Sequence, residues 1–231
     1  MSNWTVWVFA FLIWKIWRQI YDNIVINSDQ IEKLKAITEQ SKGNIILCPT
    51  HWSYVDFLIM SYILFHFKME VPYICAGEDF LNMAVVHHIL RQSGAFFMKR
   101  SFRDDPLYKA IFNTYVQKLM EDGNAFEFFV EGTRSRTGKM LKPKFGLLTV
   151  LLDAFYDWRV DNLQFVPINI NYSRVLEAES YPGELLGEDK MKESMGRLVK
   201  AYSTLKMNFG YIFVEFGDPI DYRKYQEPLI P

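Results

Sequence analysis

The sequence predicts an α/β fold: a layered α/β/α domain with a central, largely parallel or mixed sheet flanked by helices, plus an aromatic helix at the N-terminus. Three observations predict it. Short apolar runs rich in β-branched and aromatic residues alternate with longer segments of helical periodicity. Half of the 231 residues are hydrophobic, which is enough for one sizeable core. The chain has no repeat or long linker, so we expect an N-terminal helix (residues 1–27) and one domain (residues 28–231).

The expected elements alternate along the whole domain. The helical segments are Ser28–Gln40, Ser53–His66, Asp79–Arg91, Pro106–Glu121, Gly146–Trp158 and Asp189–Asn208. The strand-like runs are Ile45–Cys48, Tyr73–Cys75, Ala95–Met98, Phe126–Val130, Phe165–Ile170 and Tyr211–Phe216. Strands that alternate with helices indicate a sheet covered on both faces. In such sheets functional side chains gather where strands end, so the residues that follow each strand are the first candidates for a site.

The segment Trp4–Tyr21, WTVWVFAFLIWKIWRQIY, is strongly aromatic. It is apolar on every face as far as Trp14 and then carries Lys15 and Arg18. Its uninterrupted apolar part is well short of the ~20 residues that a spanning helix needs. No cationic segment precedes it and no small-residue cleavage site follows it, so we do not expect a signal peptide. Indoles beside cations suit the headgroup boundary of a bilayer, so we predict membrane contact, with a docked core helix or an oblique span as the alternatives.

Charge and cysteine content argue against several classes of site. A net charge of -1 and a pI near 6.4 give no overall attraction to nucleic acid, so any anion site must be a local cluster of cations. Cys48 and Cys75 both lie in strand-like runs, and we predict reduced core residues rather than a disulfide. His87 and His88 occupy adjacent helical positions, which do not share a face, so no metal site is predicted.

The stretch CPTHWSYVDF follows a strand-like run and places an imidazole five residues before a carboxylate. We expect His51 in the turn after the strand, and Asp56 in the first turn of a helix with Ser53 at its N-cap. There the helix dipole favours an ionised carboxylate, which fixes one ring nitrogen and leaves the other to take a proton from a hydroxyl. The competing interpretation is a capping box beside a surface histidine. A serine hydrolase is disfavoured because no G-x-S-x-G elbow surrounds Ser53.

A second strand end leads into a cationic loop. The stretch FFVEGTRSRTGKMLKPKFG leaves an apolar run at Glu131 and Gly132, and no acidic residue intervenes from there to Leu152. Glycines allow close backbone approach, and paired guanidinium groups hold phosphate by two-point contacts. We expect Glu131 to pair with an arginine. The cations of this loop are Arg134, Arg136, Lys139, Lys142 and Lys144.

A third strand end repeats the pattern in the stretch GAFFMKRSF. It presents Lys99 and Arg100, and Arg103 follows closely. Two strand ends that deliver arginines to the edge that carries His51 would form a phosphate pocket. The alternative is a solvated basic surface, or contact with anionic lipid heads.

Four blocks, HWSYVD, GAFFMKR, FVEGTRSR and VPINI, occur in this order between Pro49 and about Asn171. They resemble the four blocks of the glycerolipid acyltransferases. The flanking LKPKFGLL, YPGELLGEDKMKES and NFGYIFVEFGDPI are more similar to the dihydroxyacetone-phosphate and glycerol-phosphate branch than to the lysophosphatidate branch. The resemblance implies that His51 is a general base and Asp56 its partner. It also implies an acceptor-phosphate site formed by Arg100, Glu131, Gly132 and Arg134. Arg136 and Lys139 are added to this site on charge alone.

The activity implied by the resemblance is transfer of a fatty acyl group from acyl-CoA to the primary hydroxyl of dihydroxyacetone phosphate or glycerol 3-phosphate. Acyl-CoA is then a co-substrate, and no metal or redox cofactor is expected. The expected partners are these substrates and a membrane lipid surface. The protein would be membrane-associated, facing the cytosol or an organelle; the resemblance adds the peroxisome, although no S-K-L-like tripeptide closes the sequence. Because members of the branch are usually much longer, we expect a compact relative or a fragment.

Two other functions stay open at this point. One is acylation of lysophosphatidate or another lysolipid, with the same base and a more apolar acceptor. The other is a non-catalytic module that binds anionic membranes through its aromatic helix and basic loops. The sequence does not indicate an oligomeric state.

Overall fold

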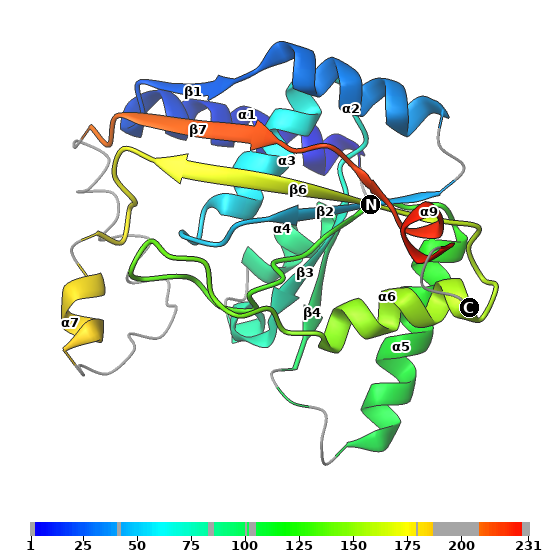
Figure 1. Cartoon of the computed structure of the whole chain (residues 1–231). Coiled ribbons are helices and arrows are strands. Elements are labelled where there is room, and N and C mark those ends of the chain that lie inside the picture. Colours follow the sequence, from blue (N-terminus) through cyan, green and yellow to red (C-terminus); the bar gives the residue numbers. More distant parts are fainter. Residues whose placement is uncertain are drawn as a thin grey trace.

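The computed structural model describes residues 3–40, 43–82, 86–99, 101, 105–178, 180–186 and 208–227. Strands and helices alternate along the chain (Figure 1). The strands are β1 (Asn23–Ile26), β2 (Asn44–Pro49), β3 (Tyr73–Gly77), β4 (Ala95–Met98), β5 (Phe126–Glu127), β6 (Leu163–Tyr172), β7 (Tyr211–Phe216) and β8 (Ile220–Asp221). The helices are α1 (Asn3–Ile20), α2 (Ser28–Gln40), α3 (Asp56–His66), the 3-10 helix η1 (Glu78–Asn82), α4 (Val86–Gln92), α5 (Pro106–Glu121), α6 (Gly146–Tyr156), α7 (Tyr181–Leu185) and α9 (Tyr222–Gln226).

The strands form one mixed sheet in the order β1-β7-β6-β2-β5-β3-β4, with β8 paired to β6. β2 lies parallel between β6 and β5, and β3 and β4 continue the parallel set. β7 runs antiparallel to β6, whereas β1 runs parallel to β7. A central, largely parallel sheet between helices confirms the predicted fold class. Because parallel strands end at the same edge, the segments that follow β2, β4 and β5 leave the sheet together.

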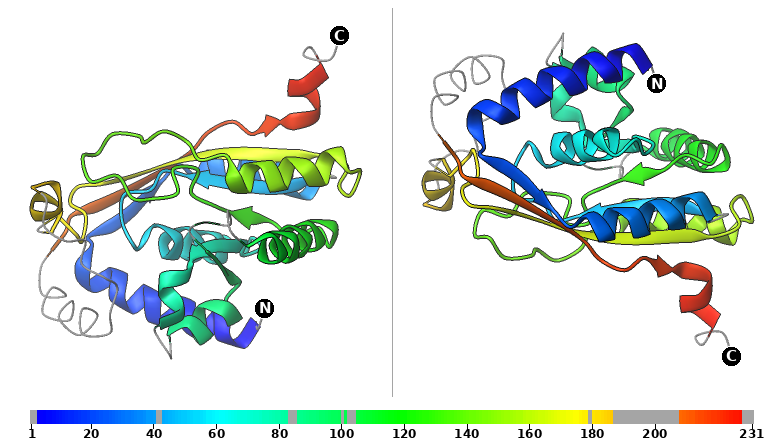
Figure 2. Two further views of the ribbon diagram at one scale, coloured as in Figure 1. Left: turned by 90° about the horizontal axis from the view of Figure 1, so that it is seen from below. Right: turned by 90° about the horizontal axis from the view of Figure 1, so that it is seen from above.

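Side chains alternate between the two faces of the sheet and enter two separate cores. On β2, Leu47 joins a core built with α1, α2 and α3, whereas its neighbour Ile46 joins a core built with α5 and α6. Both side chains are almost completely buried. Figure 2 shows α3 between α1 and the sheet. The buried residues of α6 belong to the other core. Burial on both faces explains why the central strand reads as a continuous apolar run rather than an alternating one.

α1 has one face in the core and one face in solvent. Ile13, Trp17 and Ile20 are buried in the core that contains α3, whereas Trp4 and Trp7 are 75% and 61% exposed. α1 therefore docks on the domain through its inner face and leaves an aromatic outer face uncovered. Among the described helices, none combines the length and the apolar content that a membrane crossing requires.

Several expected boundaries were wrong. The helix expected from Ser53 begins at Asp56, and the strand expected to reach Val130 ends at Glu127. That strand stops because the chain turns, with Gly132 N donating to the carbonyl oxygen of Phe129 at 2.9 Å. Within the helix expected over residues 79–91, the structure has η1 and then α4. The short elements β1, β8, α7 and α9 were not predicted. The helix expected over residues 189–208 lies outside the described residues, apart from residue 208.

Candidate active site

Three neighbouring strands bring two loops together at one edge of the sheet. β2 is followed by residues 50–55 and β5 by residues 128–145, while β6 continues past the end of β2 through residues 169–172. Thr50 N donates to the carbonyl oxygen of Ile168 at 2.9 Å, which holds the first loop on β6. Ser135 N donates to the carbonyl oxygen of His51 at 2.8 Å, which ties the second loop to the first. The histidine loop and the cationic loop are therefore in direct contact.

His51 and Asp56 form a hydrogen-bonded pair. Nδ1 of His51 lies 2.9 Å from Oδ2 of Asp56, and the imidazole stacks on Phe129 with 3.9 Å between ring centroids. The same Oδ2 accepts from the backbone N–H groups of Trp52 at 2.7 Å and Ser53 at 2.9 Å. Asp56 is completely buried. Because the carboxylate accepts at Nδ1, the imidazole carries its proton there and keeps a lone pair on Nε2.

The second oxygen of Asp56 has a partner that sequence analysis did not identify. Oδ1 accepts a hydrogen bond from the hydroxyl of Tyr172, the last residue of β6. Burial and the charge of Asp56 raise the pKa of Tyr172 well above its ordinary value, so this hydroxyl stays a donor. Both carboxylate oxygens are thus engaged, and the orientation of the carboxylate is fixed by four donors.

Ser53 does not cap α3, contrary to expectation. The N-cap position is Val55, which makes no side-chain cap hydrogen bond, and Asp56 opens the helix. The Ser53 hydroxyl instead donates to Oε2 of Glu177 at 2.8 Å, and Tyr54 N donates to Oε1 of Glu177 at 2.7 Å. Glu177 therefore binds the histidine loop through both of its carboxylate oxygens.

Glu131 was expected to pair with an arginine. Among the described residues it instead joins the two loops by accepting from backbone N–H groups. Its Oε1 accepts from His51 N at 3.0 Å and its Oε2 accepts from Leu141 N at 2.8 Å. The side chain is buried. Each carboxylate oxygen thus holds one loop, and Glu131 sets the distance between them.

Gly132 occupies a position that only glycine fits. Its φ is +62°, a left-handed conformation that residues with a Cβ rarely adopt. A Cβ at this position would lie 2.8 Å from Cδ of Lys144. The positive φ of Gly132 and the close side chain of Lys144 therefore favour glycine at this position.

Arg134 is buried and held by three aromatic or acidic neighbours. Its Cζ lies 3.2 Å from the ring centroid of Tyr54. Its Nη1 donates to Oε1 of Glu177 at 3.4 Å and to the hydroxyl of Tyr181 at 3.2 Å. Tyr181 in turn donates to the carbonyl oxygen of Trp52 at 2.5 Å. Burial raises the pKa of Glu177, while the N–H of Tyr54 and the guanidinium of Arg134 act in the opposite direction.

The remaining predicted cations differ in their surroundings. Arg136 is partly buried, and its Nη1 donates to the carbonyl oxygen of Arg134 at 2.9 Å. The side chain of Lys139 is exposed, and its carbonyl oxygen accepts from the Ser135 hydroxyl at 2.6 Å. Arg100 lies outside the described residues, and so does Arg103. The structure therefore brings six of the eight predicted site residues together: His51, Asp56, Glu131, Gly132, Arg134 and, through its hydrogen bond to Arg134, Arg136.

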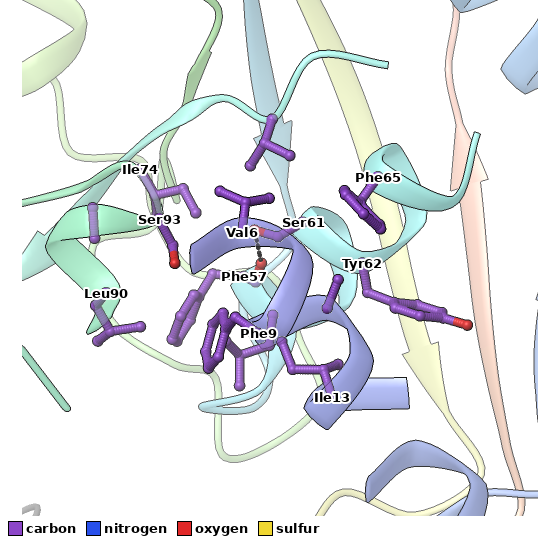
Figure 3. Close-up of a pocket in the computed structure, with 14 residues that line it drawn as sticks. Val6, Phe9, Ile13, Phe57, Ser61, Tyr62, Phe65, Ile74, Leu90 and Ser93 are labelled. Atoms are coloured by element: carbon purple, nitrogen blue, oxygen red, sulfur yellow. Dashed lines mark hydrogen bonds between the residues drawn. The ribbon is translucent and has the colours of Figure 1, made fainter. Parts of the chain in front are cut away.

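An apolar pocket lies beside the start of α3, between α1, α3 and α4 (Figure 3). Val6 and Phe9 of α1 line it on one side, and Phe57 and Tyr62 of α3 line it on another. Phe57 directly follows Asp56 in the chain. α3 therefore carries both the acid of the histidine pair and part of the pocket lining. No group of three or more His, Cys, Asp or Glu side chains placed to hold a metal ion occurs in the described part of the chain.

Comparison with known proteins places this geometry in context. A family model described as "Acyltransferase" matches residues 25–171, which include both loops and all the strands that carry them. A second model, described as "Glycerol-3-phosphate acyltransferase C-terminal region", matches residues 181–231.

Curated relatives and one solved structure are similar over most of this chain. "Dihydroxyacetone phosphate acyltransferase" of Mus musculus is 46% identical over 216 residues, which are 93% of this chain and 32% of that protein. "Glycerol-3-phosphate acyltransferase" of Pseudomonas putida is 43% identical over 223 residues, which are 95% of this chain and 26% of that protein. The chain thus spans about a third or less of the length of these relatives. The crystal structure of the 1-acyl-sn-glycerophosphate (LPA) acyltransferase PlsC from Thermotoga maritima superposes with a TM-score of 0.51 over 90% of this chain and 69% of that chain; at 19% identity the likeness concerns the fold.

Proposed function

This chain belongs to the acyltransferase family, and on that premise we propose that it transfers a fatty acyl group from acyl-CoA to the primary hydroxyl of dihydroxyacetone phosphate or glycerol 3-phosphate. The names of the mouse and Pseudomonas relatives support these two acceptors. The observation that carries the proposal is the pair of His51 and Asp56, in which Nδ1 is bound to the buried carboxylate and Nε2 is the other ring nitrogen.

In the proposed reaction Nε2 of His51 is the general base. The acceptor hydroxyl oxygen attacks the carbonyl carbon of the thioester while Nε2 takes the hydroxyl proton. The tetrahedral intermediate then collapses, the carbon–sulfur bond breaks, and the coenzyme A sulfur leaves and takes the proton from the imidazolium. Asp56 holds the ring and stabilises its cationic form between these steps. General-base assistance of this kind contributes ~100- to 10,000-fold to the rate.

The acceptor's phosphate is proposed to bind along the cationic loop. Arg134 commits Nη1 to Glu177 and Tyr181, but its Nε and Nη2 make no hydrogen bond within the described part of the chain. A guanidinium held from one side keeps its other donors in a fixed direction, which suits two-point binding of phosphate. Gly132 lies in the same loop, beside the side chain of Lys144. The proposal also assigns Glu131, Arg136, Lys139 and Arg100 to this site.

The acyl chain and the membrane are proposed to meet at α1. The apolar side chains between α1, α3 and α4 are proposed to contact the hydrocarbon chain, because they form a small pocket that is lined almost wholly by apolar side chains. The exposed Trp4 and Trp7 on the outer face of α1 suit the headgroup boundary, where an indole keeps its ring in the apolar layer. We therefore propose a membrane-associated enzyme; cytosol-facing and organellar membranes, including the peroxisomal one, fit this surface equally.

The acceptor is tested by measuring thiol release from palmitoyl-CoA. Separate reactions contain dihydroxyacetone phosphate, glycerol 3-phosphate, lysophosphatidate or no acceptor. We expect thiol release that depends on one of the two three-carbon phosphates. Release with lysophosphatidate alone would replace the proposed acceptor, and vesicle binding without any thiol release would indicate a non-catalytic membrane module.

The general base is tested by the variant His51→Ala. We expect turnover to fall about 1,000-fold or more, because no other side chain replaces Nε2, while thermal stability and acceptor binding stay near those of the unsubstituted protein. His66→Ala is the matched control, since His66 is an exposed residue at the end of α3. Near-normal thiol release by purified His51→Ala protein would contradict the mechanism.

A further inference from the structure

The two oxygens of Asp56 are held very differently. Oδ2 accepts from Nδ1 of His51 and from the N–H groups of Trp52 and Ser53. Oδ1 accepts only from the hydroxyl of Tyr172 within the described part of the chain. Asp56 has no exposed surface, so water does not replace a lost donor there. Three donors therefore hold Oδ2, whereas the Tyr172 hydroxyl alone holds Oδ1 among the described residues.

We propose that Tyr172 is a positioning residue of the acyl-transfer site: its hydroxyl fixes the carboxylate of Asp56 so that Oδ2 faces Nδ1 of His51. The part of this inference that concerns turnover rests on the proposed function. Without the hydroxyl, Oδ1 is an unpaired buried oxygen. The carboxylate is then less neutralised by hydrogen bonding and interacts more strongly with the imidazole. Tyr172 acts through Asp56 and is not placed to touch the acceptor or the thioester.

The surroundings of Tyr172 hold its ring in place. Tyr172 is paired with Ile212 of β7 in the antiparallel part of the sheet. Its ring centroid lies 6.1 Å from that of Tyr21, which follows α1. The ring of Tyr21 packs in turn on Trp17 at 6.0 Å and Phe209 at 5.9 Å. The phenol is therefore supported by packing from α1 and β7 and delivers its hydroxyl in one direction.

Tyr21 provides a matched control. It is a second buried phenol beside Tyr172, but its hydroxyl has no hydrogen-bond partner within the described part of the chain. Replacing either tyrosine by phenylalanine removes one hydroxyl from the same aromatic cluster. Only the change at Tyr172 removes a donor to Asp56.

Other titratable groups face the pair from neighbouring elements. Glu127 lies on β5, Glu177 precedes α7, and Tyr181 lies in α7, while Glu131 binds the backbone of His51. These groups are unchanged in both tyrosine variants. A shift seen only on substitution of Tyr172 is therefore assigned to its hydroxyl.

The experiment measures the pKa of His51 by NMR titration of its ring protons, together with the pH profile of kcat/KM. In Tyr172→Phe we expect the pKa of His51 to rise by roughly 0.5–1 unit, because a less neutralised carboxylate stabilises the imidazolium. At neutral pH we expect kcat to fall about tenfold with little change in the acceptor KM, because less of the base is unprotonated and the ring is less well oriented. Tyr21→Phe is expected to match the unsubstituted protein in both measurements.

A second substitution keeps the test decisive where Tyr172→Phe does not fold. Difluorotyrosine placed at residue 172 preserves the ring and makes the hydroxyl a stronger donor, so the pKa of His51 is expected to fall rather than rise. If Tyr172 had a purely structural role, the two substitutions would not shift the pKa of His51 in opposite directions. No shift, or a downward shift in Tyr172→Phe, overturns the inference, and so does an upward shift with difluorotyrosine. The NMR titration needs no turnover, so the positioning role stands or fails independently of thiol release by His51→Ala, which tests the proposed function.

Discussion

Glu127 shows how a single buried side chain affects the energetics of the whole fold. It lies on β5, is completely buried, and has both carboxyl oxygens without a hydrogen-bond partner in the described part of the chain. Burial, and then the charge of Asp56, raise the pKa of Glu127 well above its ordinary value of 4.5. The folded protein therefore keeps this proton to a higher pH than the unfolded chain does.

This proton makes stability depend on pH with a definite sign. Below the ordinary pKa of glutamate both states are protonated, and Glu127 carries no ionisation penalty. As pH rises above about 5, the unfolded state releases its proton and the folded state does not, so the free energy of unfolding falls by about 1.4 kcal/mol per pH unit until the folded pKa is reached. We expect Glu127→Gln to lack this fall, which is measured by urea unfolding of both proteins between pH 5 and 8.

The control for this prediction is Glu121→Gln. Glu121 is paired with Arg159 and Lys118, and those contacts lower its pKa, so its contribution to stability is lost as pH falls rather than as pH rises. Between pH 5 and 8 the control should therefore differ from the unsubstituted protein by a constant amount, whereas the difference between Glu127→Gln and the unsubstituted protein should grow as pH rises. Parallel pH profiles for Glu127→Gln and the unsubstituted protein would show that Glu127 is ionised in the fold.

Single residues also show how far the sequence predicts the site. His51 and Asp56 were identifiable because they lie five residues apart beside a strand end. Tyr172 and Glu177 were not, because they contact Asp56 and Ser53, respectively, from more than 100 residues further along the chain. No local spacing encodes such a contact. The role of Glu131 was misjudged for a related reason: its partners are backbone amides, which every loop contains.

At the level of elements, length and periodicity decide which parts of the fold the sequence predicts. α2, α5, β4 and β7 have the predicted bounds, because each pairs a clear pattern with a distinct start or end. The N-cap Asp105 and the proline that opens α5 are an example. β1 and β8 have four and two residues, and so short a strand is defined by its partner in the sheet rather than by its own sequence.

The two faces of α1 give a prediction that separates membrane binding from folding. Trp4→Ser with Trp7→Ser removes two exposed indoles, so thermal stability should change little. Binding to vesicles that contain anionic phospholipid should fall about tenfold or more, since each indole buries a large apolar area on insertion. Co-sedimentation with vesicles and thermal unfolding measure the two effects.

Trp17→Ser is the converse control. Trp17 is 5% exposed within the core, so its loss should destabilise the fold by about 3–5 kcal/mol. Unchanged vesicle binding by the double variant would show that the outer face of α1 has another partner.

At the level of the whole molecule, the order of strands follows from simple rules. Alternation of helices and strands predicts a layered sheet, and the parallel strands place their loops at one edge, as observed for the histidine and cationic loops. The antiparallel insertion of β7 between β6 and β1 was not predictable from periodicity. It requires β1 to pair with β7, and these strands are separated by nearly 190 residues in the chain.

This pairing leads to a prediction about the boundary expected at residue 27. Residues 28–231 alone lack β1 and the buried Ile13, Trp17 and Ile20, so the edge of β7 and one core are uncovered. We expect this fragment to be poorly soluble or to lack the near-ultraviolet circular dichroism of packed aromatic residues. A deletion of residues 1–5 removes the exposed Trp4 and leaves the core residues, so this variant should keep the near-ultraviolet circular dichroism signal. A cooperatively unfolding fragment 28–231 would show that the first helix is an appendage.

The way in which Glu131 holds the two loops leaves their side chains free to vary. Both of its hydrogen bonds end on main-chain N–H groups, at residues 51 and 141, and every amino acid except proline supplies that donor. Met140, which is 78% exposed, and Leu141 are thus open to diversification while the base keeps its register. A proline-free library at these two positions should therefore keep the hydrogen bonds of Glu131.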